Sequence, residues 1–167
     1  FKPDNLEIKF DEIILDQTNL ITTAKNNVKI TDLNKQISIK TDFLTFNKKE
    51  NILESQSPSV LKDNKGNTLK SDIFEYNLDD GILKLKNAKL KDFNDNNFQI
   101  ENAFLNTSTN QLIGKDIEIT LNNKSFNQEN EPRIKGKSIV YNEGFTEVTK
   151  GIFTTCKKTD KCPPWQL

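Results

Sequence analysis

Histidine and methionine are absent from this 167-residue chain, which has only two cysteines, one tryptophan and six glycines. Without histidine the chain lacks the commonest general base and metal ligand, and it cannot form a nucleophile–histidine site by itself. Its two cysteines cannot complete a four-ligand zinc site. A phosphate-binding loop is also missing, because Gly114-Lys115 has neither the upstream glycine nor the following serine or threonine. These absences leave an enzyme built on carboxylates as the catalytic alternative, and no cofactor is expected.

Positive and negative charges balance, since Lys plus Arg and Asp plus Glu each number 24. The basic residues also form no long run. A nucleic-acid partner is therefore not expected. Long hydrophobic runs are also lacking: the longest aliphatic run is Ile13-Ile14-Leu15, which is far too short for a helix to span a membrane. The missing methionine leads us to expect a processed protein or a domain cut from a longer chain, with any signal peptide removed.

What the sequence does contain is a repeat of about 30 residues. Each of five copies opens with an isoleucine or leucine, at Ile8, Ile39, Leu69, Ile100 and Ile134. Three positions into the first three copies stand Asp11, Asp42 and Asp72. The residues five positions in are all apolar: Ile13, Leu44, Phe74, Leu105 and Ile139. Those seven positions in are Leu15, Phe46, Tyr76, Thr107 and Tyr141.

This alternation is typical of β-strands, and turn signals such as Asp79-Asp80-Gly81 separate the strands. One such unit cannot bury its apolar face alone, whereas stacked copies can. The sequence therefore predicts an all-β fold: an open, stacked β-jelly roll of about five repeats, each with two short strands and two turns. Positions zero, five and seven cannot all face the same side of a straight strand, because one is even and the other two are odd. This conflict predicts a bend or bulge between positions zero and five.

A stacked roll of this kind has an apolar interior and two unpaired edge strands, which can accept a strand from another domain. In most domains such an interior is a packed core. If the two sheets splay apart, however, the same interior becomes a trough for acyl chains. The candidate lipid-contacting residues are Leu44, Phe46, Phe74, Tyr76, Phe104, Leu105, Ile139 and Tyr141.

The strand repeats, with Asn-Asn-Val-Lys-Ile at 26–30 and Ser-Asp-Ile-Phe-Glu-Tyr at 71–76, resemble the OstA-like domains of lipopolysaccharide transport proteins, whose fold is called a β-taco. The ending runs from Gly151 to Cys156 and then to Cys162-Pro163-Pro164-Trp165-Gln166. It is similar to the junction between jelly roll and transmembrane β-barrel in the LptD family of outer-membrane assembly proteins. The bridge families LptA and LptC share the repeat, so the ending is what favours LptD.

The resemblance implies a non-enzymatic role in lipopolysaccharide transport, at the periplasmic face of the outer membrane of a Gram-negative bacterium. The jelly roll would receive lipopolysaccharide from the bridge protein LptA through edge-strand pairing. It would pass the acyl chains along its trough toward the barrel, which the lipoprotein LptE plugs. The resemblance also divides the chain into an OstA-like domain at residues 1–152 and a junction at residues 153–167.

Both cysteines lie in this junction, and their spacing is not that of a redox Cys-x-x-Cys motif. In an oxidising compartment they could pair with each other, pair with cysteines outside this chain, or stay unpaired. The resemblance matches Cys156 to a bridging cysteine of the family and Cys162 to a second cysteine of some relatives. The family's cysteine near the start of the chain has no counterpart here, which leaves the full bridging scheme open.

Three alternatives to an LptD-type protein stay open. The first is a bridge protein of the LptA or LptC kind, and the second is a structural β-solenoid with a fully packed interior. The third is a carboxylate-based glycan enzyme on a solenoid, for which the column Asp11, Asp42 and Asp72 is the only candidate cluster. Polarity at turns or sheet edges explains that column better, because Asp is frequent beside strand ends.

Overall fold

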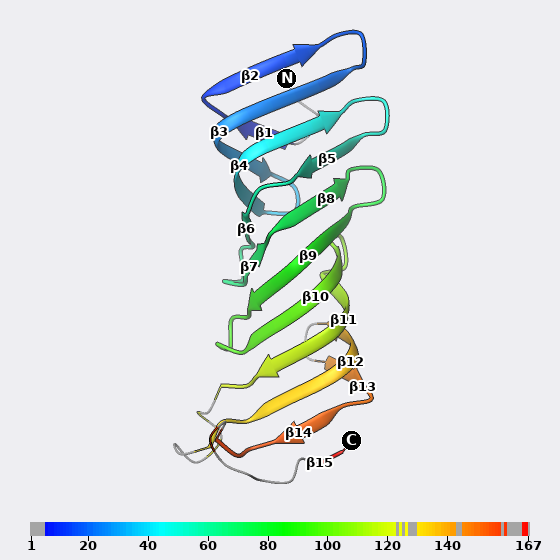
Figure 1. Ribbon diagram of the computed structural model, residues 1–167. Helices are drawn as coiled ribbons and strands as arrows, with labels where there is room; N and C mark the ends of the chain where they lie inside the picture. The colour runs from blue at the N-terminus through cyan, green and yellow to red at the C-terminus, as the bar shows by residue number, and fades with distance from the viewer. Residues whose placement is uncertain are drawn as a thin grey trace.

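The computed structural model describes residues 6–122, 124, 126, 130–142, 145–157, 159 and 165–166. In this part of the chain, fifteen antiparallel strands form one continuous sheet. In chain order they are β1 (Leu6–Lys9), β2 (Glu12–Asp16), β3 (Ile21–Asp32), β4 (Ile37–Asn47), β5 (Ile52–Ser55), β6 (Ser59–Lys62), β7 (Thr68–Ser71), β8 (Ile73–Asn77), β9 (Ile82–Lys91), β10 (Asn97–Asn106), β11 (Gln111–Thr120), β12 (Arg133–Asn142), β13 (Phe145–Thr149), β14 (Ile152–Thr154) and β15 (Trp165–Gln166). They stack along one axis, with β1 and β15 at opposite ends (Figure 1). The predicted all-β stacked roll is confirmed, and no helix among the described residues is long and apolar enough to span a membrane.

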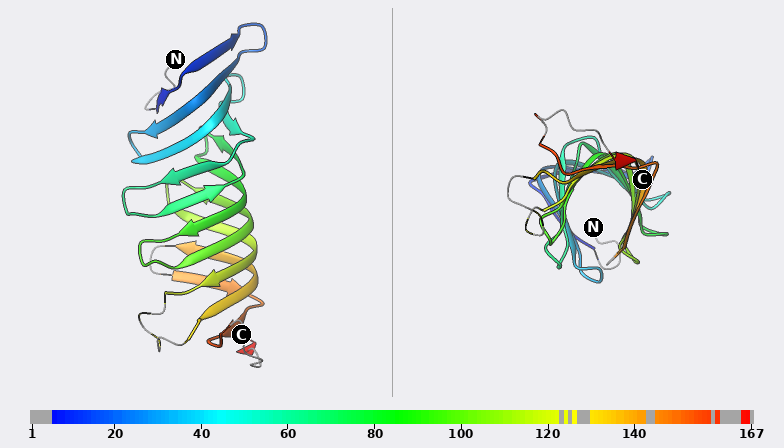
Figure 2. Two further views of the ribbon diagram at one scale, coloured as in Figure 1. Left: turned by 60° about the vertical axis from the view of Figure 1, so that its left-hand side comes forward. Right: turned by 90° about the horizontal axis from the view of Figure 1, so that it is seen from below.

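Each repeat forms one outgoing and one returning strand, and both strands cross the two walls of the roll. In β4, residues 45–47 pair with β5 in the first wall, whereas residues 38–40 pair with β6 in the second wall. Where the bend between the walls is sharp, the crossing strand is divided in two, as in β1–β2 and β7–β8. Seen end-on, the stacked strands superimpose in a ring-like outline (Figure 2). The predicted two strands and two turns per repeat are present, but the strands are longer than expected and bent.

The bend lies at the third position of each repeat. Asp42 of β4 is left out of the pairing with β3, and Glu101 of β10 is left out of the pairing with β9. Asp11 and Asp72 lie between β1 and β2 and between β7 and β8. Because one residue is left out of the pairing, the inward positions of the strand change parity across the bend. This confirms the bend predicted between positions zero and five.

The returning strands bend at the same place, which we call the corner, through residues in the left-handed backbone conformation. Asn27, Asn87 and Asp116 have φ between 51° and 53°, a region that Asn and Asp enter more readily than other residues with a side chain. Asn27 Nδ2 donates to Asp11 Oδ2 over 2.6 Å, and Asn87 Nδ2 donates to Asp72 Oδ2 over 2.8 Å. These aspartates therefore help to hold the corner in shape, which gives their recurrence at this position a structural reason.

We expect the Asn87→Ala variant to lose about 1–2 kcal/mol of unfolding free energy, because alanine resists the left-handed conformation that asparagine tolerates. The Asn87→Gly variant loses the same hydrogen bond to Asp72 but adopts a positive φ without strain. The alanine variant should therefore be the less stable of the two in urea unfolding. Equal losses in the two variants would mean that the side-chain hydrogen bond, and not the backbone conformation, stabilises the corner.

The bend also corrects the alignment of the fourth repeat. Glu101 occupies the bend there, so this repeat begins at Phe98, two residues before the start expected from the sequence. Its fifth and seventh positions are then Ala103 and Leu105, each two residues before the one expected. With this shift, the bend lies three residues into every copy.

The apolar core lies between the two walls, on their inward faces. In the N-terminal half, large and fully buried side chains such as Leu44, Leu53 and Phe74 fill the first wall. In the C-terminal half, the equivalent row contains Ala103, which pairs with Gly114.

Candidate functional site

Two rows of turns form the rims of the roll. The first rim comprises the turns at residues 17–20, 48–51, 78–81 and 107–110, and the second rim comprises those at 33–36, 63–67 and 92–96. Each turn begins with an Asp or Asn whose side chain accepts backbone N–H groups of the turn: Asp16, Asn47, Asn77 and Asn106 on the first rim, and Asp32, Asp63 and Asp92 on the second. Such Asx turns fix the chain reversal locally.

Hydrogen bonds also join successive turns along each rim. On the first rim, the backbone N–H of Thr107 donates to the carbonyl oxygen of Gly81 over 2.9 Å. On the second rim, the backbone N–H of Phe93 donates to Asn67 Oδ1 over 2.9 Å. The exposed Asp16 carboxyl has a pKa below its ordinary value, because the backbone N–H of Asn19, and then its side chain, donate to it. Both rims are therefore ordered edges, and the space between them is the mouth of the roll.

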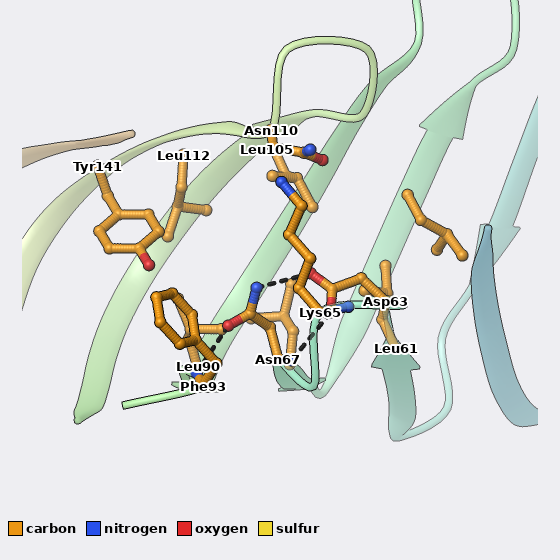
Figure 3. Close-up of a pocket in the computed structure, with 12 residues that line it drawn as sticks. Leu61, Asp63, Lys65, Asn67, Leu90, Phe93, Leu105, Asn110, Leu112 and Tyr141 are labelled. Atoms are coloured by element: carbon orange, nitrogen blue, oxygen red, sulfur yellow. Dashed lines mark hydrogen bonds between the residues drawn. The ribbon is translucent and has the colours of Figure 1, made fainter. Parts of the chain in front are cut away.

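A hollow opens between the walls near the middle of the roll. It is partly open to solvent. The second wall lines it with Ile37, Leu61, Leu69 and Leu90, and the first wall with Leu105, Leu112 and Tyr141. The rims add Asp63, Lys65, Asn67, Phe93 and Asn110 (Figure 3). The lining is thus apolar inside and polar at the mouth, as a site for an amphipathic ligand requires.

A second hollow, also partly open to solvent, adjoins the first toward the C-terminal end. Phe93 and Tyr141 line both hollows. Phe98 and Tyr141 meet edge to face in the second, with ring centroids 5.3 Å apart. Ile119, Leu121, Ile134 and Val148 complete its apolar lining. The two hollows thus lie next to each other between the middle of the roll and its C-terminal end, and we call them together the channel, defined by these lining residues.

The structure brings seven of the predicted lipid-contacting residues to the interior. Leu44, Phe46, Phe74, Tyr76 and Ile139 are buried, while Leu105 and Tyr141 line the channel. Those five buried residues lie in the packed core and not among the channel-lining residues, so their contact with lipid stays a prediction.

The prediction is wrong for Phe104. Its side chain is 44% exposed and lies on the outer face of β10, between the inward Ala103 and Leu105. Adjacent residues of a strand face opposite sides, so Phe104 and Leu105 cannot both line one trough.

Sequence reasoning missed the leucines of the second wall. Leu61 and Leu90 lie in the second half of their repeats, where apolar residues also alternate with period two. That alternation was the available signal, but the site prediction used only the first half of each repeat. Leu69 and Leu112 were missed as well, because they lie outside positions five and seven.

The C-terminal segment continues the sheet beyond the last repeat. β14 pairs with β12, and β15 pairs with β14, across the domain boundary expected at residue 152.

Cys156 is disulfide-bonded, and its carbonyl oxygen accepts a hydrogen bond from Arg133 Nη2 over 2.8 Å. Cys162 lies outside the described residues, and the pairing of the two cysteines stays a prediction. Among the described residues, no three His, Cys, Asp or Glu side chains are placed to hold a metal ion.

No protein-family model matches the chain, and no curated protein matches it. Solved structures do match it. One is the crystal structure of LptH from Pseudomonas aeruginosa, the LptA-homologous periplasmic component of the conserved lipopolysaccharide transport device. The TM-score is 0.56, and the alignment covers 66% of this chain and 81% of LptH. The chain has the fold of LptH. At 14% sequence identity, the likeness to LptH extends to the fold alone.

Proposed function

We infer that this chain carries the acyl chains of a lipid in the apolar channel between its walls. The observation that carries this inference is the hollow that is lined by leucines from both walls and open between two polar rims. Each CH₂ group that enters such a site contributes about 0.8 kcal/mol, so a chain can be held without specific polar contacts. No step of this role needs a catalytic residue.

We further infer that the lipid is lipopolysaccharide and that the chain acts in the periplasm as a bridge protein of the LptA kind. The fold of LptH supports this assignment, because LptH belongs to a lipopolysaccharide transport device. The N-terminal edge fits the same role: among the described strands β2 pairs only with β3, and its apolar Ile14 and Leu15 are exposed. An open edge of this kind can pair with a strand of a neighbouring bridge protein.

A second candidate is the jelly roll of an LptD-type protein, at the periplasmic face of the outer membrane. The ending with Cys156 and Cys162-Pro163-Pro164-Trp165 favours it, as does the disulfide bond of Cys156. In that case a barrel and its LptE partner would follow. The genomic reading frame distinguishes the two: several hundred further residues with alternating strands support LptD, and an early stop supports the bridge.

Site-specific photocrosslinking in the host cell tests the lipid role. Leu105 and Leu112 pair across β10 and β11 and line the channel, whereas the neighbouring pair, Phe104 and Ile113, is exposed on the outer face. We expect lipopolysaccharide adducts from probes at Leu105 and Leu112 and none from probes at Phe104 and Ile113. Equal labelling of both pairs, or none in a correctly folded protein, would leave the packed structural solenoid as the better account.

A further inference from the structure

A cluster of polar side chains crosses the mouth of the roll beside the first hollow. Lys35, on the second rim, donates from Nζ to Tyr76 Oη over 3.0 Å and to Thr107 Oγ1 over 2.7 Å. Tyr76 lies one residue before the end of β8 at the first rim, and Thr107 begins a turn of that rim. The two hydroxyl oxygens are 3.1 Å apart, and Tyr76 Oη also lies 3.5 Å from Asp32 Oδ2. These four residues, which we call the strap, therefore connect one rim directly to the other.

Three of the four strap residues are buried, although the strap lies at the mouth, and Lys35 is half-buried. Tyr76, Thr107 and Asp32 are only 3%, 4% and 8% exposed. Polar groups so far from solvent are costly unless each has a hydrogen-bond partner, and here the partners come from the opposite rim. Separation of the rims would therefore expose these groups to water, which can replace the lost bonds.

Gly81 provides the close approach that the strap requires. Its φ is +71°, and a Cβ atom there would lie 3.0 Å from Lys35 Nζ and 3.2 Å from Thr107 Oγ1. Thr107 Oγ1 also lies 2.9 Å from the Gly81 carbonyl oxygen and donates to it. A side chain at this position would meet both strap residues and would be strained at this φ. The turn is thus shaped to receive the Lys35 ammonium group.

The strap marks the boundary between two differently filled parts of the roll. On its C-terminal side, the hollow is lined by Ile37 and Leu105, each two residues from a strap residue. On its N-terminal side, the interior is filled by buried side chains such as Phe46 and Leu53. A lipid path along the whole roll would have to open at this boundary.

We propose that the strap is a closure element of the lipid channel. With Lys35 bonded to Tyr76 and Thr107, acyl chains enter only the C-terminal hollows; when Lys35 releases them, the rims separate and the N-terminal half becomes accessible. This proposal rests on the proposed lipid-carrying function. Hydrogen bonds exchanged for bonds to water contribute little net stability, so the strap itself can open at a low cost in free energy.

Hydrogen exchange measured without lipid tests whether the strap holds the rims together. The Lys35→Met variant keeps a long apolar side chain but loses the ammonium group, and Tyr76→Phe loses only the hydroxyl. We expect roughly two- to tenfold faster exchange in the turn at 107–110 for both variants, the factor for losing about one net hydrogen bond. The control is Lys49→Met, the same charge change on an exposed turn of the first rim. Exchange unchanged from wild type in both strap variants would overturn the proposal.

Labelling with a diazirine-bearing long-chain fatty acid tests whether the strap closes the path. In wild type we expect adducts on the peptide containing Leu105 and few on the peptide containing Phe46. The Lys35→Met variant should gain several-fold labelling at Phe46 with little change at Leu105. Strong labelling of Phe46 in wild type, or none in the variant, would show that the strap is not the barrier. Absence of labelling at Leu105 counts against the lipid-carrying function, and the exchange measurement then still decides whether the strap holds the rims.

Discussion

Replacement of Phe74 by alanine is expected to lower the unfolding free energy by about 3–5 kcal/mol, the range found for buried phenylalanines. Phe74 is 1% exposed and belongs to the largest fully buried side chains of the roll. It lies on β8, between Ser55 of β5 and Leu85 of β9 in the register of the sheet. Removal of the ring leaves a cavity that these paired strands cannot close, because their hydrogen bonds fix their spacing. Urea unfolding followed by far-UV circular dichroism measures the loss.

The matched control for this prediction is Phe104→Ala. It removes the same side chain from the outer face of β10, where Phe104 pairs with the exposed Ile113. Its only expected loss is a cross-strand contact, worth less than about 1 kcal/mol. Similar losses for the two variants would mean that the inward and outward faces have been assigned wrongly.

Most of the architecture could be predicted from the sequence, because a stacked roll repeats the same local problem in each copy. The apolar alternation predicted strands, and the conflict of parity among positions zero, five and seven predicted a bend. The column of Asp11, Asp42 and Asp72 lies at that bend. Asp recurs there because a short polar side chain can hydrogen-bond to the returning strand, as Asp72 does with Asn87.

The fourth repeat was misaligned for a reason that is general to strands. A shift of two residues keeps every side chain on its own face, so Phe98 and Ile100 are both buried and both fit the first position. Only the bend residue distinguishes the two alignments. In this copy the bend residue is Glu101 and not aspartate, which removed the marker that the first three copies share.

The site could be predicted only in outline. The first-wall residues Leu105 and Tyr141 were found because they repeat, but the position of the hollow depends on how side chains of both walls fill the space between them. The strap left no signal at all. Lys35 and Thr107 are 72 positions apart, and a lysine in a polar turn is typical of a solvated surface. Their contact is a product of the stacking, which brings distant turns to opposite sides of one mouth.

The Leu105→Gln variant is expected to bind acyl chains roughly tenfold more weakly, or weaker still. Leu105 lines the first hollow, and an amide without a hydrogen-bond partner in apolar surroundings costs about 1–3 kcal/mol. Each 1.4 kcal/mol corresponds to about a factor of ten in the dissociation constant. Titration of the folded protein with a fluorescent long-chain fatty acid measures this constant directly, and circular dichroism checks that the variant keeps its strands.

Phe104→Gln is the control for this binding measurement, because it makes the same kind of change one residue away on the opposite face of β10. Its affinity should equal that of the wild type, since an exposed amide is hydrated by water and does not meet the bound chain. Only a difference between the two variants assigns binding to the interior. If Phe104→Gln weakened binding as much as Leu105→Gln, the probe would be bound on the outer surface, and the channel would have to be regarded as an incompletely filled core.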